Sequence, residues 1–367
     1  MTDKRIYQIG LTMINGVGDM LARNLLQSLG DVEAIFNEKQ HLLEKIPGIG
    51  RTLAAEIKHP EVLLRAEKEL TFVERNSIAT YFLTDSHYPL RLRECADAPV
   101  LFYFKGDTNL NQKRILSIVG TRNATTYGKE QLDLLIRELA TSFPELLIVS
   151  GLAYGIDIHA HRAALQQQLP TVAVLAHGLD RIYPATHRET AVRMLAHGGL
   201  LTEFPSETQP DRPHFVKRNR IVAGLADATL VVESAEKGGS LITADLAFSY
   251  GRDVFAFPGR ATDPQSKGCN ELVRQNKAGL ITSAADLIAA LCWDIQTTSA
   301  PKQASLLFEE ELTDNPLLRL IYAHDEIHVN TLALELDTPI HQLSAKLFEL
   351  EMEGKIRSIP GNRYKRV

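Results

Sequence analysis

The segment that decides how the rest of this chain is interpreted is Asp211-Arg-Pro-His-Phe-Val-Lys-Arg-Asn-Arg-Ile-Val-Ala-Gly-Leu225. Its cationic side chains, with no acid between them, are Arg212, Lys217, Arg218 and Arg220. The same segment supplies Phe215, an aromatic ring on which a base can stack, and the polar amide of Asn219. This combination predicts a segment that binds nucleic acid.

On both sides of this segment, short apolar runs alternate with helix-length amphipathic stretches. The predicted strands cover 115–119, 146–149, 171–175, 200–204, 229–233 and 253–257, and the predicted helices cover 126–141, 155–168, 189–196, 216–225 and 240–250. Such alternation is typical of α/β proteins, and we predict an extended Rossmann-like, doubly wound sheet within residues 76–293. In these sheets, ligands bind outside the carboxyl ends of the strands.

Three turns that follow predicted strands carry residues suited to binding anions. Arg122 follows the first strand and offers a planar fork of donors for phosphate, while small residues in the other two turns leave backbone N–H groups accessible. The candidates in those two turns are Ser150, Gly151, Lys237, Gly238, Gly239 and Ser240. The chain has no Gly-x-Gly-x-x-Gly after the first strand and no Gly-x-x-x-x-Gly-Lys-Ser/Thr, so we predict no nucleotide cofactor.

The composition is that of an ordinary globular protein. The 367 residues are 44% hydrophobic and 23% charged, and the formal net charge is −5, so any nucleic-acid binding must come from a local patch. Three widely spaced cysteines form no zinc motif and no disulfide framework, which fits a reducing compartment. No signal peptide and no apolar run near the roughly 20 residues of a membrane span are apparent. We therefore expect a cytoplasmic protein with no membrane partner.

No catalytic or metal-binding set emerges from the sequence. His159 and His161 are two residues apart and point to different faces of the predicted helix, which makes them poor joint metal ligands. Ser150 lacks the Gly-x-Ser-x-Gly surroundings of an activated nucleophile. We expect a protein that is not an enzyme.

Arg218 and Arg220 are also two residues apart, so their side chains diverge on a helix by about 200°. The sequence leaves open whether one of them pairs with an acid such as Glu203 or Glu233 instead of reaching DNA.

Residues 1–75 are predicted to form a small helical domain. Ile14-Asn-Gly-Val-Gly18 and Ile46-Pro-Gly-Ile-Gly50 are two copies of one glycine turn, each followed by a helical pattern. This resembles tandem helix-hairpin-helix (SAM-like) modules, whose turns contact DNA phosphates without reading sequence. A purely structural packing turn remains the alternative. After this domain, residues 88–106 are expected to form an edge strand or an extended arm with solvent-exposed charges.

The carboxyl-terminal part is predicted to contain a polar linker, 294–313, and a winged-helix domain, 314–367. Predicted helices at 316–323, 329–336 and 340–353 precede a hairpin at 355–366 that turns around Pro-Gly-Asn. The third helix carries Lys346 against Glu349, Glu351 and Glu353, which makes it a poor reader of the major groove. The hairpin is basic, and contact with a DNA backbone or docking to protein are both open.

Six ordered motifs within about residues 81–291 are similar to those of the DNA-processing protein A family (DprA/Smf). They are Val119-Gly-Thr-Arg122, Ser150-Gly-Leu-Ala-Tyr-Gly-Ile-Asp-Ile-His-Ala-His161, Phe215-Val-Lys-Arg-Asn-Arg-Ile-Val-Ala-Gly-Leu225, Gly239-Ser-Leu-Ile-Thr-Ala244, Gly251-Arg-Asp-Val-Phe-Ala-Phe-Pro-Gly259 and Gly268-Cys-Asn-Glu-Leu272. The resemblance implies an extended Rossmann fold that binds single-stranded DNA in a basic pocket, forms a homodimer, and helps to load the RecA recombinase during natural transformation. It also implies that Arg122 meets a phosphate, that Arg212 is the basic residue of the pocket, and that Phe215 contacts a base. Arg218, Asn219 and Arg220 would line or brace the groove.

The sequence leaves two alternative functions. A nucleotide phosphoribohydrolase on a similar sheet would need a Pro-Gly-Gly-x-Gly-Thr-x-x-Glu loop, whereas this chain has Lys237-Gly-Gly-Ser-Leu-Ile-Thr243 without the glutamate. A winged-helix regulator would need a basic third helix, which the chain lacks. The leading prediction is therefore a non-enzymatic mediator that binds single-stranded DNA.

Overall fold

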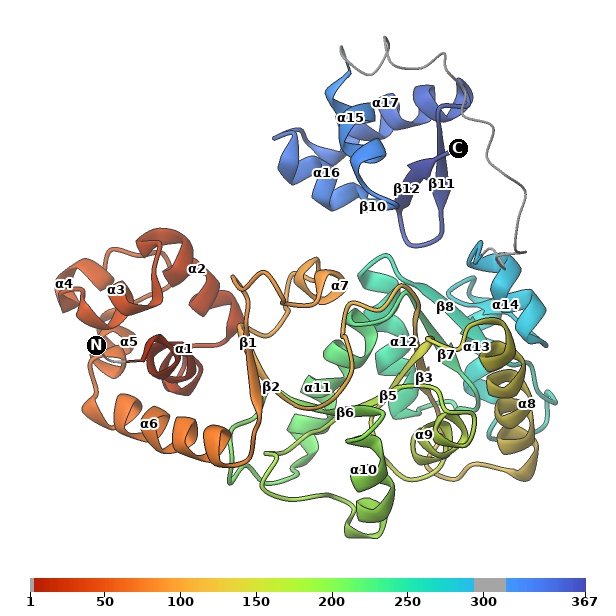
Figure 1. The fold of residues 1–367 in the computed structure, drawn as a ribbon, viewed down its shortest axis with the longest axis horizontal. Helices are drawn as coiled ribbons and strands as arrows, with labels where there is room; N and C mark the ends of the chain where they lie inside the picture. Colours follow the sequence, from red (N-terminus) through yellow and green to blue (C-terminus); the bar gives the residue numbers. More distant parts are fainter. Residues whose placement is uncertain (1–2, 294–314) are drawn as a thin grey trace.

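A computed structural model describes residues 3–293 and 315–367 of the chain (Figure 1). Its centre is a nine-stranded sheet with the order β1-β2-β6-β5-β4-β3-β7-β8-β9. The strands are β1 (Ala79–Phe82), β2 (Leu101–Gly106), β3 (Ile115–Val119), β4 (Leu147–Ser150), β5 (Thr171–Val174), β6 (Gly198–Thr202), β7 (Ala228–Val231), β8 (Asp253–Ala256) and β9 (Gly279–Leu280). The chain runs from β3 outward to β6 and then returns to place β7 on the other side of β3. The predicted doubly wound sheet is confirmed.

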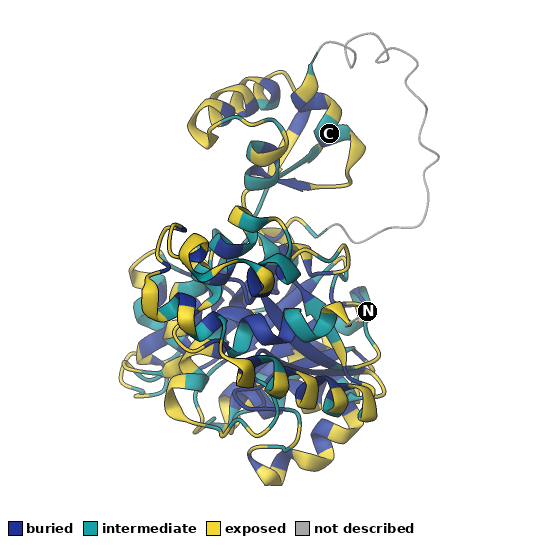
Figure 2. Cartoon of the chain, turned by 90° about the vertical axis from the view of Figure 1, so that its left-hand side faces the viewer, coloured by how far each residue is buried: buried dark blue, intermediate teal, exposed yellow. Residues whose placement is uncertain are grey.

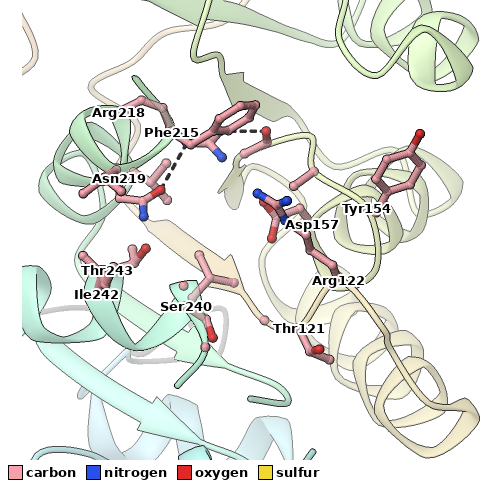
Figure 3. A pocket seen from close by; sticks show the side chains of 18 of the residues that line it. Thr121, Arg122, Tyr154, Asp157, Phe215, Arg218, Asn219, Ser240, Ile242 and Thr243 are labelled. Atoms are coloured by element: carbon pink, nitrogen blue, oxygen red, sulfur yellow. Dashed lines mark hydrogen bonds between the residues drawn. The ribbon is translucent and has the colours of Figure 1, made fainter. Parts of the chain in front are cut away.

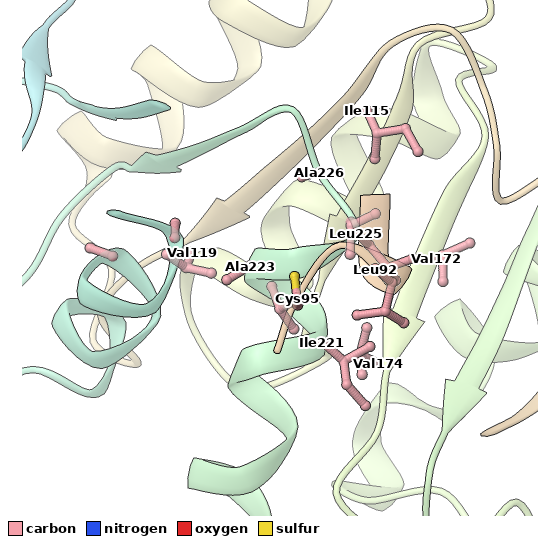
Figure 4. Packing of buried hydrophobic residues seen from close by; sticks show 14 of the residues in the cluster. Leu92, Cys95, Ile115, Val119, Val172, Val174, Ile221, Ala223, Leu225 and Ala226 are labelled. Atoms are coloured by element: carbon pink, nitrogen blue, oxygen red, sulfur yellow. The ribbon is translucent and has the colours of Figure 1, made fainter. Parts of the chain in front are cut away.

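Helices cover both faces of this sheet because its central strands are apolar on both sides. The helices are α8 (Thr126–Ser142), α9 (Ile156–Gln166), α10 (Arg188–Met194), α11 (Arg212–Gly224), α12 (Gly239–Ser249), α13 (Lys267–Arg274) and α14 (Ala284–Ala290). In β3, Ile115 and Val119 belong to the same core cluster as residues of α11 (Figure 4), α12 and α13. Leu116 and Ile118 pack instead with α8, α9 and α14. Such alternation is what a strand of period two imposes when both of its faces are buried.

The segment 88–106 differs from its prediction. It forms the short helix α7 (Leu90–Arg93) and then β2, which lies inside the sheet between β1 and β6 and pairs antiparallel with both. The edge strand at this end of the sheet is therefore β1. The charges of this segment are also not all exposed, because Arg91 is buried with its Nε 2.6 Å from Asp227 Oδ1. A partner this far away in sequence gives no local signal.

The amino-terminal helical domain packs directly against the antiparallel end of the sheet. It contains α1 (Lys4–Met13), α2 (Asp19–Leu29), α3 (Val32–Asn37), α4 (Gln40–Leu43), α5 (Arg51–Ile57) and α6 (Pro60–Arg75). The two predicted glycine turns precede α2 and α5, and Gly16 and Gly48 adopt positive φ values of 78° and 86° that favour glycine. Asp19, at the start of α2, accepts a hydrogen bond from the backbone N–H of Val100. The first turn therefore faces the central domain, which supports the structural alternative there.

The winged-helix domain has its own apolar core. Its elements are α15 (Pro316–Ala323), β10 (Ile327–His328), α16 (Val329–Glu335), α17 (Ile340–Met352), β11 (Ile356–Ile359) and β12 (Arg363–Arg366), with the sheet order β10-β12-β11. The three predicted helices and the hairpin are present. Figure 2 shows the buried residues concentrated in the central sheet, with a smaller set inside this domain. The predicted linker 294–313 lies outside the described residues, and the domain boundaries remain predictions.

Among the residues that the structure describes, no helix is both long and apolar enough to span a bilayer.

Candidate nucleic-acid interface

A pocket of about 640 Å³ opens at the carboxyl ends of the parallel strands, where β3 and β7 lie side by side and the chain reverses its direction of winding (Figure 3). This is the topological switch point, the usual ligand site of such sheets. The three glycine-containing loops singled out in the sequence all contribute to it, from β3 to α8, from β4 to α9 and from β7 to α12. Helix α11 closes the fourth side with Arg212, Phe215, Arg218 and Asn219.

Small residues and one buried acid allow these loops to approach one another. A Cβ on Gly155 would lie 2.2 Å from the carbonyl oxygen of Thr121, so the β4–α9 loop can pass the β3–α8 loop only with glycine at this position. Glu233, which is buried after β7, accepts hydrogen bonds from the backbone N–H (2.9 Å) and the hydroxyl (2.5 Å) of Thr125. The loop that carries Arg122 is therefore held from both sides.

Arg122, Arg212 and Lys237 supply exposed positive charge around the pocket. Within the described chain, none of the three forms an ion pair with a carboxylate at 4.0 Å or less, so their charge remains available to an anion. The Arg122 guanidinium carbon lies 5.6 Å from the centre of the Phe215 ring, and the ring of Tyr183 lies 6.0 Å from that of Phe215. Cations and aromatic faces thus share one concave site, which is the arrangement that binds single-stranded nucleic acid.

Arg218 has a different role from Arg122 because it is only 4% exposed. Its Nη1 donates hydrogen bonds to the carbonyl oxygens of Gly151 (2.6 Å) and Val174, and a Cβ on Gly151 would lie 2.3 Å from the guanidinium. Burial lowers the pKa of Arg218, and it raises that of the buried Asp157 carboxyl, an effect that the positive charge of Arg218 opposes. Arg218 therefore braces the floor of the pocket more than it reaches into the open space.

Three predicted site residues do not line the pocket. Arg220 Nη2 lies 2.5 Å from Glu203 Oε2 and 3.1 Å from Asp19 Oδ2. The sequence left open whether this arginine pairs with an acid or reaches DNA, and in the structure it pairs with Glu203. Lys217 Nζ lies 2.7 Å from the same carboxylate oxygen. The fully buried Ser150 hydroxyl donates to the carbonyl oxygen of Ile118 at 2.6 Å and is unavailable to a phosphate. Arg220 and the Ser150 hydroxyl are engaged inside the protein and are not retained in the proposed contact set, whereas contact of the half-exposed Lys217 with DNA stays a prediction.

The structure also adds residues that were not among the predicted site residues, although all of them except Tyr183 lie within the motifs quoted above. Tyr154 and Tyr183 line the pocket and are 48% and 46% exposed. The other added lining residues are Thr121, Asp157, Ile242 and Thr243. Tyr154 had a usable signal, since it lies in a loop directly after a predicted strand. Tyr183 had none, because only the fold brings the loop beyond β5 to α11. In the two described stretches of the chain, no group of three His, Cys, Asp or Glu residues is arranged to hold a metal ion.

The fold and the site together define a Rossmann-type α/β protein with an electropositive pocket and two accessory helical modules. Family models match the chain in the same order, as a SAM-like helix-hairpin-helix tandem at residues 9–59, DNA recombination-mediator protein A at 79–292 and the DprA winged helix domain at 299–362. The chain belongs to the DNA recombination-mediator protein A family (DprA/Smf).

Individual relatives agree with this assignment. Protein Smf of Escherichia coli is 34% identical over 299 residues, which cover 80% of this chain and 79% of that protein. DNA processing protein DprA of Bacillus subtilis is 41% identical over 223 residues, covering 60% and 74%. Among solved structures, DprA of Streptococcus pneumoniae matches with a TM-score of 0.64 and 33% identity over 77% of this chain and 97% of that one. DprA of Helicobacter pylori, described for its single-stranded DNA binding mode, matches with a TM-score of 0.53 and 32% identity over 59% and 97%.

Proposed function

We propose that this protein binds single-stranded DNA in the switch-point pocket, protects it, and loads the RecA recombinase onto it during natural transformation. The observation that carries the proposal is the meeting of Arg122 and Phe215 in one pocket, with the guanidinium over the face of the ring. A phosphate next to Arg122 would place the attached base within reach of Phe215. The DNA processing proteins to which the chain is related, one of them described as binding single-stranded DNA, support this assignment.

The geometry favours a single strand over a duplex. Phe215 is partly buried at the wall of the pocket, so a base must leave any stack to contact its face. Guanidinium and ring contacts carry no base code, so we expect binding without sequence preference. The contact set that we propose is Arg122, Gly151, Arg212, Phe215, Asn219, Lys237, Gly238, Gly239 and Ser240, with Tyr154 and Tyr183 added and Arg218 as a brace.

The test of DNA binding is a competition between random-sequence single-stranded and double-stranded oligonucleotides of equal length for the full chain. We expect the single strand to win and the affinity to fall steeply as salt rises, because phosphate contacts release counterions. Equal affinity for the duplex, or a preference for one duplex sequence, would contradict the proposal. The winged-helix domain would then become the candidate reader.

The remaining parts of the proposal concern partners and chemistry. We propose a cytoplasmic homodimer that acts without catalysis. The dimer proposal is supported by Phe248 on α12 and Leu280 on the edge strand β9, which are each 53% exposed on elements that both contact β8. RecA loading is tested by ATP hydrolysis of RecA on single-stranded DNA covered with a single-strand-binding protein. We expect the full chain to shorten the lag, and an unchanged lag with DNA binding intact would limit the function to protection.

A further inference from the structure

The turn of the winged-helix hairpin contains a buried residue, Gly361, beside the partly buried Pro360 and the exposed Asn362, although hairpin tips are normally among the most exposed parts of a domain. The turn joins β11 to β12 through Pro360, Gly361 and Asn362, and Gly361 is buried. Its neighbour is the turn before β8, since a Cβ added to Gly251 would lie 2.8 Å from Asn362 Nδ2. The hairpin tip therefore rests on the central domain.

An arginine at the base of this turn is enclosed by carboxylates from two domains. The side chain of Arg363 is 11% exposed, with its Nη1 2.8 Å from Glu326 Oε1 and 3.4 Å from Asp227 Oδ1. Glu326 belongs to the winged-helix domain, whereas Asp227 belongs to the central domain and is also bound by Arg91 and by the backbone N–H of Ile115. A guanidinium desolvated in this way is stabilised only when carboxylates remain beside it.

The residue that follows helix α7 contributes a further charge to the same place. Glu94 lies 2.7 Å from Arg252, which follows Gly251 in sequence. His328 in β10 is 5% exposed, and burial lowers its pKa to about 4, with Arg252 and Arg363 acting in the same direction and Glu94 opposing them. Residues of β10 and the hairpin thus share one electrostatic environment with residues of the central domain.

The position of this contact in the sheet separates it from the DNA pocket. Asp227 immediately precedes β7, Gly251 lies two residues before β8, and Ile115 begins β3, so the contact lies at the amino ends of parallel strands. The pocket lies at their carboxyl ends. A domain held here leaves the pocket open.

We propose that the surface formed by Asp227, Glu94 and the Gly251 turn, here called the hairpin dock, is a specific docking site for the chain's own β11–β12 turn. Docking in cis holds the winged-helix domain at the amino-end edge of the sheet. It also occupies the Asn362–Arg363 tip, the part of a wing that would otherwise approach a DNA backbone. The tip of the hairpin is therefore a ligand of the central domain in this state and not a DNA contact.

A disulfide tests the docking directly in the full chain. Gly251→Cys and Asn362→Cys are combined in a Cys292→Ser background, because Cys292 is an exposed thiol. The control pairs Gly251→Cys with Arg357→Cys, an exposed position on the other strand of the hairpin. We expect an intramolecular disulfide in the first pair, independent of protein concentration, and a large loss of disulfide yield in the control. Equal yields in both pairs, or a disulfide only between chains, would overturn docking in cis.

A charge reversal provides a second measurement that does not depend on a substitution at Gly251, where φ is +68°. Arg363→Glu places a third acid beside Asp227 and Glu326, and Arg357→Glu is the matched change outside the dock. By small-angle X-ray scattering we expect a larger radius of gyration for Arg363→Glu alone, with affinity for single-stranded DNA within about twofold of wild type because the two sites are distant. An unchanged radius of gyration, or a large loss of DNA affinity, would overturn the proposal.

Discussion

Arginines lie at both ends of the parallel strands, but they differ in their exposure and in their pairing with carboxylates. At the carboxyl ends, Arg122 and Arg212 are exposed and, within the described chain, lie beyond 4.0 Å of any carboxylate. At the amino ends, Arg91, Arg252 and Arg363 are largely buried and each pairs with a carboxylate. The paired arginines at the amino ends stabilise the fold. The accessible arginines at the carboxyl ends can bind an anion. The comparison shows that the location of acids, more than the count of bases, marks the site.

Arg220 gives the largest expected effect, because the comparison assigns it to structure despite its place in the basic segment. Arg220→Ala leaves Glu203 buried without its main partner, which typically costs about 3–5 kcal/mol of unfolding free energy. Urea denaturation measures this loss. Lys217→Ala removes a half-exposed partner of the same carboxylate and should cost about 1 kcal/mol or less. A stable Arg220→Ala protein that has lost DNA affinity would return this residue to the site.

The pH dependence of stability tests the role of a buried histidine, His161 in α9. Burial lowers the pKa of His161 from 6.5 to about 3, and its Nδ1 bonds to Thr171, whose hydroxyl proton goes to Ile148. Since the unfolded state binds the proton first, stability falls as pH decreases through the window from 6.5 to about 3. We expect the contribution of His161 to the free energy of unfolding to fall by an amount on the order of 2–3 kcal/mol between about pH 7.5 and pH 4.5.

Unfolding of His161→Gln over the same pH range isolates this contribution. Asp253 acts in the opposite direction, because burial raises its pKa to about 6 and the folded state gains a proton as pH falls below that value. Both proteins retain Asp253, so the difference between their pH profiles reports His161 alone. A profile as steep in the variant as in the wild type would show that another group is responsible.

Phe215→Ala should weaken binding of single-stranded DNA by about 1–3 kcal/mol, or roughly 5- to 150-fold, if a base stacks on this ring. Fluorescence anisotropy with a labelled oligonucleotide measures the change. Phe348→Ala is the matched control, since Phe348 is a 63% exposed ring on the winged-helix domain far from the pocket lining. Equal losses in both variants would place base stacking outside the pocket.

The smallest effect is expected for Ser150→Ala. This hydroxyl follows β4 as a phosphate-binding residue would, but it donates to the carbonyl oxygen of Ile118 inside the sheet. Its removal should cost about 1 kcal/mol of stability and leave DNA affinity within about twofold. A clear loss of affinity without a loss of stability would show that the loop rearranges when DNA binds.

The sheet and the position of its ligand site were predictable because they depend on patterns within the chain. Apolar runs of strand length, separated by helical patterns, predict a doubly wound sheet, and small residues after the strands mark the loops that meet at its carboxyl edge. The observed ends of strands differ from the predicted ends where the local strand propensity is weak. β6 begins at Gly198, two residues before the predicted strand at 200, because two glycines hide the start of a strand.

The fate of individual charges was not predictable, because it depends on partners far away in sequence. Arg220 meets Asp19 across 201 positions, and Arg91 meets Asp227 across 136. No window around either arginine contains these acids. Tyr183 reaches Phe215 for the same kind of reason, since only the finished fold brings the two loops together. The docking of the hairpin through Arg363 also depends on the tertiary arrangement of two domains.

The most direct test of the central claim is the salt dependence of single-stranded DNA binding in wild type, Arg122→Ala and Arg220→Ala. Each phosphate contact adds about 0.7 to the slope of log affinity against log salt for a single strand. We predict that Arg122→Ala lowers the slope by about one contact, and that Arg220→Ala, measured where it is folded, keeps the wild-type slope. The opposite pattern, with Arg122 silent and Arg220 flattening the slope, would show that the carboxyl-edge pocket is not where DNA binds.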